Sequence, residues 1–294
     1  MRVSTVQQYE STIGNIREAQ SRFLEAQQRV MTGKRINKLS DDPSGGSFVL
    51  HAKSLKAATE QYDRNLRAAQ DYLGFSESTL SDLSDLMKRA YQLSVQAANS
   101  ATEQFGRQAM IAEVDQLQKR LIELANTKGG SGQYIFAGQK TNAQPFSLSG
   151  STLSYNGDSN DVMVEIAPAQ TMGVTTKMGT TLTDAYQFLE SFKTNLTGGN
   201  LGGISGVDIQ NFQNSMNAIG SERGSVGAKL RTVDELKAHN QRRIDDFTQR
   251  ISDVEDVDMA EAITQYQTAQ TVYTAALQVA STTHQLSLMD FIRG

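Results

Sequence analysis

Apolar residues at both ends of the chain recur at alternating three- and four-residue spacings, the pattern of a helix that packs along one stripe. In the N-terminal segment the apolar members of this stripe are Val6, Tyr9, Ile13, Ile16, Phe23 and Val30. Gln20 and Gln27 occupy the two remaining positions, so the sequence predicts a heptad seam diluted by glutamine. Gly33 is expected to end the helix in the left-handed conformation that glycine adopts without strain.

A loop is predicted from residue 34 to residue 43. Asp42-Pro43 is typical of a helix start, because proline is tolerated at the first helical position, where its missing N–H has no partner to lose. The N-terminal helical arm is therefore assigned to residues 1–43.

The C-terminal arm is assigned to residues 255–294, starting where the heptad pattern loses phase at residues 255–258. Such a slip marks a kink or a change of packing partner. The new seam consists of Met259, Ile263, Tyr266, Tyr273, Leu277 and Ala280. From Ala262 to Met289 the chain has no Asp, Glu, Lys or Arg. This composition fits a helix covered by protein on both faces, and it fits equally a Gln- and Thr-rich helix with one solvated face.

The middle of the chain is predicted to be a helical bundle. Apolar seams run from Tyr62 to Ala97, from Met110 to Leu124 and from Val207 to Val254. Lys237 and Asn240 hold polar positions in the last of these. The glycine clusters at residues 129–132 and 198–203 are interpreted as flexible connectors.

A change of pattern predicts a small β domain over residues 133–181. Tyr134–Ala137 is a short run of strand-forming residues, and Asn156-Gly157 is expected to form a tight hairpin turn. One apolar face is expected on a strand through Val162, Val164 and Ile166.

The expected fold is mainly α: a long antiparallel helical bundle with paired N- and C-terminal coiled-coil arms and a small inserted β domain. Residues 44–132 and 182–254 would form the bundle domain.

Composition excludes several classes of function. The 28 basic and 32 acidic residues give a net charge of -4, which argues against a nucleic-acid binder or a polybasic membrane-surface protein. The absence of Cys excludes disulfides, thiolate metal sites and cysteine nucleophiles. No signal peptide or membrane span is expected. The default location would be cytoplasmic, although a protein exported without a signal peptide would look the same.

No pattern indicates catalysis, a cofactor or a metal site. His51, His239 and His284 are isolated from one another in the sequence. Residues 156–161 share only their oxygen content with a calcium loop, since the ligand spacing and the final Glu are missing. An enzyme is therefore the weakest hypothesis.

Several longer strings resemble the flagellin-like proteins of the bacterial flagellum over essentially the whole chain. Four of them are Met1–Thr5, Gly33–Asn37 with Ser40–Pro43, Leu93–Asn99, and Leu286–Phe291, and several of these are shared across flagellins and hook-associated proteins. Within the second, the loop motif consists of Arg35, Asn37, Asp41, Asp42 and Pro43. Three more strings resemble most closely the hook-associated protein 3 family: Gly132–Gly138 with Pro145-Phe146, Tyr155–Asp158, and Val164–Pro168.

The resemblance implies a structural, extracellular protein of the flagellum. Its subunits would form a short ring at the hook–filament junction, between hook-associated protein 1 and the flagellin filament. Export would use the flagellar type III apparatus without a cleaved signal peptide. A dedicated chaperone would bind the C-terminal arm, residues 259–291, before export.

The resemblance also makes the two arm seams the expected assembly interface. Arms with little apolar surface are marginal alone, so they can stay unfolded during export and become ordered on assembly. Attraction between Arg17, Arg22 or Arg29 and the acidic start of the C-terminal arm would add little.

Two alternatives stay open. A short flagellin would build the filament itself. The β insert could instead bind a carbohydrate or another surface, although it has no Trp and few aromatic residues to do so.

Overall fold

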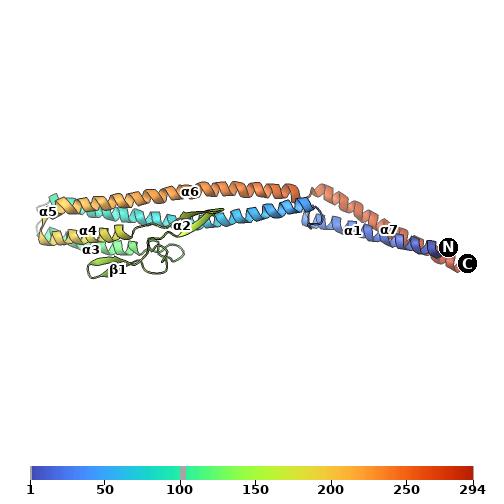
Figure 1. The fold of residues 1–294 in the computed structure, drawn as a ribbon, viewed down its shortest axis with the longest axis horizontal. Helices are drawn as coiled ribbons and strands as arrows, with labels where there is room; N and C mark the ends of the chain where they lie inside the picture. Colours follow the sequence, from blue (N-terminus) through green and yellow to red (C-terminus); the bar gives the residue numbers. More distant parts are fainter. Residues whose placement is uncertain (1, 100–103, 294) are drawn as a thin grey trace. The chain divides into compact units, whose positions relative to one another are not determined.

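The computed structural model describes the backbone of residues 2–99 and 104–293, and the side chains of residues 7, 10–99, 106–200 and 202–282. The chain divides into two units, residues 1–58 with 243–294, and residues 59–242. Long helices dominate both units, and a small strand region belongs to the second (Figure 1). The predicted mainly α fold with a small β insert is confirmed.

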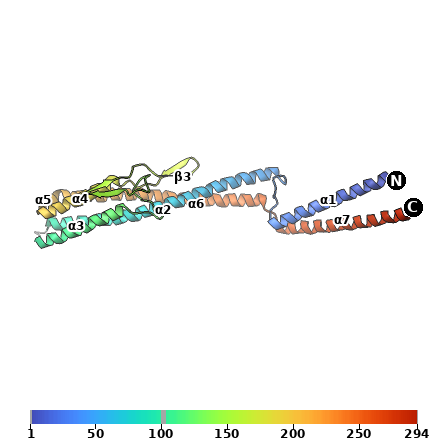
Figure 2. The same cartoon turned by 90° about the horizontal axis from the view of Figure 1, so that it is seen from below.

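The first unit contains the two arms. Its helices are α1 (Arg2–Thr32), the first turns of α2 (Pro43–Asn99), the last turns of α6 (Ile209–Glu255), and α7 (Met259–Arg293). Helices α1 and α7 lie side by side and antiparallel, with both chain ends at the same end of the pair (Figures 1 and 2). Gly33 ends α1 with φ of 68°, and its N–H bonds to the Arg29 carbonyl, which confirms the predicted cap.

The phase slip before α7 is a break between two helices. Helix α6 ends at Glu255, and Asp258 caps the next helix, its Oδ1 accepting the Ala260 N–H at 2.8 Å. A side-chain oxygen at this position satisfies a backbone donor that has no partner within the helix. The break therefore gives α7 a capped start of its own.

The second unit is a bundle around one apolar core. It contains most of α2 and α6 together with α3 (Gln104–Ala125) and α4 (Gly179–Gly198). Helix α2 continues without a break through Gly74, because the leucines on either side bury the same stripe; Leu66, Leu73, Leu80 and Leu83 are fully buried. Helix α6 meets α2 through ion pairs and hydrogen bonds such as Arg223–Glu77 at 2.7 Å and Lys237–Gln70 at 2.6 Å.

The β insert consists of two antiparallel hairpins that share the core of the bundle. Strand β1 (Phe146–Ser149) pairs with β2 (Thr152–Tyr155), and β3 (Met163–Ala167) pairs with β4 (Gln170–Gly173). Phe146, Leu153 and Ile166 join the same buried cluster as the leucines of α2. The alternating face of the third strand is as predicted, with Val164 and Ile166 inward and Met163 exposed.

Two predictions inside the insert are wrong. The run from Tyr134 to Ala137 is not a strand. Ile135, Phe136 and Ala137 are buried. Their backbone carbonyls accept hydrogen bonds from tyrosine hydroxyls and from a loop N–H. Tyr72 donates to the Ile135 carbonyl at 2.6 Å, and Tyr155 donates to that of Phe136 at 3.1 Å.

The predicted hairpin turn at Asn156-Gly157 is also wrong. The turn of the first hairpin is Gly150-Ser151, between the paired Ser149 and Thr152, and Gly150 has φ of 64°. Gly157 serves a different purpose, since a Cβ there would collide with the Tyr155 hydroxyl. The glycine therefore makes room for the partly buried ring of Tyr155.

Both glycine clusters form turns with defined backbone contacts, and their flexibility stays a prediction. The Gly129 N–H bonds to the Gln133 carbonyl at 2.8 Å, and the Phe75 ring lies against Gly130. At the second cluster, α4 ends on Gly199 with φ of 66°, and a short helix α5 (Leu201–Gly203) follows.

A π-helical turn, η1 (Ile204–Asp208), leads from α5 into α6 and buries an acidic residue. The Asp208 carboxylate accepts hydrogen bonds from Ser191 at 3.1 Å and from Asn195 at 2.8 Å. Burial raises the pKa of Asp208, and these two donors only partly offset that effect.

Candidate assembly surface

The seam between α1 and α7 combines small residues with larger apolar and aromatic ones. On α1, Ala19 and Ala26 are buried, and the half-buried members are Ile13, Ile16, Phe23 and Val30. On α7 the inward residues follow heptad spacing: Ala262, Tyr266, Ala269, Tyr273, Ala276 and Ala280. The prediction that Gln20 fills a seam position is wrong, because it is exposed and Ala19 is buried next to it.

One aromatic contact stands out in this seam. The Phe23 ring lies between two tyrosines of α7, with its centroid 5.5 Å from that of Tyr266 and 5.7 Å from that of Tyr273. The ring planes of Phe23 and Tyr273 are nearly parallel, at 10°. Each such pair contributes about 0.5–1.5 kcal/mol beyond the burial of area. Because alanines occupy the neighbouring layers, Phe23 fixes the register of the two arms.

The structure separates the predicted interface residues into two groups. Ile13, Ile16, Phe23, Val30, Tyr266 and Tyr273 lie in the intramolecular seam. Met259, Ile263 and Leu277 are 44%, 42% and 43% exposed. The side chains of Val6 and Tyr9 lie outside the described residues.

Helix α7 carries more apolar surface than α1 covers. In heptad terms the inward residues occupy positions a (Tyr266, Tyr273, Ala280) and d (Ala262, Ala269, Ala276). The neighbouring e positions, here called the e flank, are Ile263, Gln270 and Leu277. The g positions, here called the g flank, are Gln265, Val272 and Val279. In a two-stranded coiled coil these flanks are usually charged. Here Val272 is 51% exposed, and the apolar e residues are exposed to a similar degree.

The threonines of α7 hydrogen-bond to their own helix. Thr264 donates to the Ala260 carbonyl at 2.8 Å, Thr268 to that of Thr264 at 2.9 Å, and Thr271 to that of Gln267 at 2.9 Å. A hydroxyl whose proton is already bonded costs less to remove from water than one that would lose a water partner. The uncharged stretch of α7 from Ala262 to Thr282 is therefore suited to burial.

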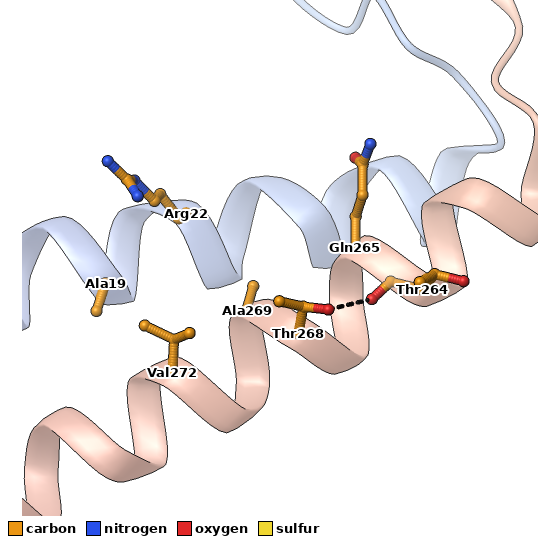
Figure 3. A pocket seen from close by; sticks show the side chains of 7 residues that line it. All are labelled: Ala19, Arg22, Thr264, Gln265, Thr268, Ala269 and Val272. Atoms are coloured by element: carbon orange, nitrogen blue, oxygen red, sulfur yellow. Dashed lines mark hydrogen bonds between the residues drawn. The ribbon is translucent and has the colours of Figure 1, made fainter.

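A shallow groove of about 270 Å³ runs along the g flank of the arm pair (Figure 3). Ala19 of α1 and Ala269 and Val272 of α7 form its apolar part, and Thr264, Gln265, Thr268 and Arg22 border it. Arg22 is neutralised within α1 by Glu18 at 2.5 Å. The groove thus has small side chains at its base and no unpaired charge among the residues that line it.

The loop between α1 and α2 is held by its own acidic residues. Asp41 accepts the backbone N–H groups of Lys38 at 2.9 Å and Asn37 at 3.0 Å, and these bonds lower the pKa of Asp41. Asn37 donates to the Lys34 carbonyl at 2.9 Å. Two residues of the predicted loop motif therefore shape the turn.

The rest of the motif starts α2. Asp42 Oδ1 accepts the Gly45 N–H at 2.9 Å and the Ser44 hydroxyl at 2.9 Å, both of which lower the pKa of Asp42. Pro43 is the first residue of the helix, as predicted. Arg35 contacts Asp42 at 3.3 Å and donates to the Val254 carbonyl at 2.8 Å, so it ties the loop to the end of α6.

Glu255 has partners in this region that the sequence did not predict. Its carboxylate, 10% exposed, accepts Lys34 at 2.9 Å and Lys53 at 2.7 Å, and its carbonyl accepts the Arg35 N–H at 2.7 Å. Burial opposes ionisation of Glu255, but the two ammonium groups outweigh it and lower the pKa. The proposed attraction to Arg22 or Arg29 is not seen, because these pair with Glu18 and Glu25 of their own helix. The heptad pattern loses phase directly after Glu255, and this was the only feature of the sequence that pointed to a special contact there.

The described part of the chain contains no cluster of metal ligands. No group of three or more His, Cys, Asp or Glu side chains there is placed to hold a metal ion. In the segment weighed as a calcium loop, Asp158 Oδ1 accepts the N–H groups of Gln139 and Asn160, so it faces donors. Among the described residues, no helix has the length and apolarity that crossing a membrane requires.

Comparisons with known proteins agree with this architecture. The flagellin N-terminal helical region matches residues 3–141, and the flagellin C-terminal helical region matches residues 209–292. The flagellar hook-associated protein 3 of Escherichia coli K12 is 26% identical, and the alignment covers 99% of each chain. The flagellar junction protein FlgL of Legionella pneumophila superimposes with a TM-score of 0.56 at 15% identity, covering 71% of this chain and 100% of that one.

Flagellins match over a smaller part. The flagellin of Salmonella paratyphi A is 30% identical, but the match covers 56% of this chain and 32% of that protein. The likeness to hook-associated protein 3 extends through the β insert. The chain belongs to the flagellin-like family of structural proteins of the bacterial flagellum, within its hook-associated protein 3 group.

Proposed function

We propose that this chain is the structural subunit that joins the flagellar hook to the filament, between hook-associated protein 1 and flagellin. The full-length match to hook-associated protein 3 supports this position. The main support for the mechanism is the exposed apolar surface of α7. Its e and g flanks carry apolar side chains beside the seam with α1 that α1 does not cover. Subunits would assemble through these flanks into a short ring.

The arm pair is suited to a protein that is exported unfolded. Its seam is built largely from alanines and half-buried residues, so the isolated pair holds little apolar area per residue. We propose that the arms pass through the flagellar type III apparatus without a cleaved signal peptide and become ordered on assembly. An export chaperone would cover the apolar face of α7 until then.

A deletion strain of the source bacterium tests the proposal. Loss of the gene should leave hooks without filaments and release flagellin monomers into the medium, and the full-length gene should restore attachment. A gene truncated after residue 258 should produce a protein that fails to restore it. Attached filaments in the deletion strain, or with the truncated gene, would contradict the proposal.

The alternative is a short flagellin, which the two flagellin regions would also fit. Purified full-length chain distinguishes them. A flagellin should polymerise alone into long filaments, whereas a junction subunit should form at most short oligomers without its neighbours. Electron micrographs that show long filaments of this chain alone would favour the flagellin.

A further inference from the structure

The corner that joins α4 to α6 buries a carboxylate held by neutral groups. Asp208 is fully buried at the end of the π-helical turn η1. In the described part of the chain, its hydrogen-bond partners are the Ser191 hydroxyl at 3.1 Å and the Asn195 amide at 2.8 Å. An ionised carboxylate is costly to bury without a counter-charge, and two neutral donors offset that cost only in part.

The charged residues on the helices packed around the corner are engaged elsewhere. On α4, Lys193 pairs with Asp115 of α3 at 2.7 Å, and Glu190 accepts the Gln118 amide at 2.8 Å. Arg107 of α3 lies beside the backbone at the end of α4. The sequence has no charged residue at positions 90–99 of α2 or 209–221 of α6. Burial raises the pKa of Asp208, and the two neutral donors lower it by less.

A series of side-chain hydrogen bonds connects the backbone of the corner to Asp208. The Gly203 N–H donates to Asn200 Oδ1 at 3.1 Å, and the Asn200 amide donates to Asn195 Oδ1 at 3.1 Å. Asn195 donates in turn to Asp208. Five of the nine residues at positions 198–206 are glycines, which lose more freedom on ordering than any other residue. The order of the corner is therefore coupled to the state of Asp208.

We propose that this corner is a proton-operated latch, closed when Asp208 is protonated and loosened when Asp208 loses its proton. In the closed form the neutral acid donates to the Ser191 hydroxyl, which can accept as well as donate, and its other oxygen still accepts from Asn195. In the loosened form water reaches the carboxylate and solvates its charge. Closing takes up one proton and opening releases it. The latch lies in the second unit and does not depend on the proposed function.

The direction of the pH response follows from the raised pKa of Asp208. The closed corner binds the proton more tightly than the open one. Closing is therefore favoured as the pH falls toward the ordinary value of 3.8, and this advantage is lost as the pH rises through the raised pKa. Asp208→Asn should reproduce the protonated form, because its amide can donate to Ser191 while its carbonyl accepts from Asn195.

Hydrogen exchange of the full-length protein tests the latch between about pH 7 and about pH 4.5, with each rate divided by the intrinsic rate at that pH. The amides that report on the corner are those of Asn200, Gly203 and Ile204, which donate within it. Amides near Leu80, in the buried core of α2, serve as the reference. The matched control is Asp184→Asn, the same chemical change at an exposed position of α4.

In the unsubstituted chain and in Asp184→Asn, protection of the corner should rise by about twofold or more relative to the reference as the pH falls. In Asp208→Asn it should already be high at neutral pH and follow the reference throughout. An unsubstituted corner that follows the reference, or a pH response that survives in Asp208→Asn, would overturn the inference.

Carboxyl-carbon NMR of the unsubstituted chain gives a second measurement that does not need Asp208→Asn to fold. The Asp208 signal is identified by its displacement in Ser191→Ala, which removes one of its two donors. Its midpoint should lie above the ordinary value of 3.8. A midpoint at or below that value would overturn the inference whatever the variants do.

Discussion

Replacing Phe23 with alanine should weaken the packing of α7 on α1 and no longer hold the two helices in one register. The substitution removes two aromatic pairs, worth about 0.5–1.5 kcal/mol each, and part of a buried ring. Because the ring is only half-buried, we expect a loss of about 2 kcal/mol, below the 3–5 kcal/mol typical of a fully buried Phe→Ala change. That loss corresponds to roughly a 30-fold increase in opening of α7.

Hydrogen exchange of the α7 amides measures this opening directly. Protection around Tyr266 and Tyr273 should fall by that factor, or disappear if the arm is less stable than 2 kcal/mol. Amides of α2 near Leu80, in the core of the second unit, should not change. The matched control is Leu24→Ala, the next residue on α1, which is 52% exposed and should have no measurable effect. Unchanged α7 protection in Phe23→Ala would refute the assignment of register to this ring.

Three further substitutions test other parts of the molecule. Ala169 has φ of 58°, so Ala169→Gly should raise the thermal midpoint by relieving about 1 kcal/mol of strain, and a lower midpoint would contradict this. Asn240 is buried with its Nδ2 unpartnered, so Asn240→Leu should increase stability in urea; a decrease would mean that the amide has a partner. Glu255 has a lowered pKa, so its contribution is present above the ordinary value of 4.5 and is lost as the pH falls further. Glu255→Gln should cost about 1–2 kcal/mol at neutral pH and flatten that acid-side decline in arm protection.

The helical architecture was predictable because the seams are long and regular. Heptad spacing identified the stretches of α2, α6 and α7. Because glycine is common at the C-terminal end of helices, Gly33 could be recognised as the end of α1. The sequence did not decide which of two adjacent residues points into a seam. Alanine and glutamine are adjacent at residues 19–20 and 26–27, and a one-residue shift in the assigned stripe exchanges them. Only the packing of Phe23 against α7 decides which of each pair is buried.

The β insert could not be predicted in detail, because long-range contacts override local preference there. Tyr134–Ala137 has strand-forming composition. The hydroxyls of Tyr72 and Tyr155 donate hydrogen bonds to its backbone carbonyls, which therefore need no partner strand. Asn156-Gly157 has the composition of a hairpin turn, but the glycine there accommodates the Tyr155 ring.

The partners of Glu255 were hidden for a related reason. Lys34 and Lys53 come from two other segments, more than 200 residues away in the sequence. A heptad pattern describes neighbours on one helix and contains no information on which distant lysine reaches a given carboxylate.

The junction role proposed for this protein depends on its position in the flagellum. Immunogold labelling of the chain on flagella isolated from the source bacterium measures it directly. Label should be confined to a short segment where the hook meets the filament. Label distributed along the whole filament would identify a filament subunit instead, and would contradict a role at the junction.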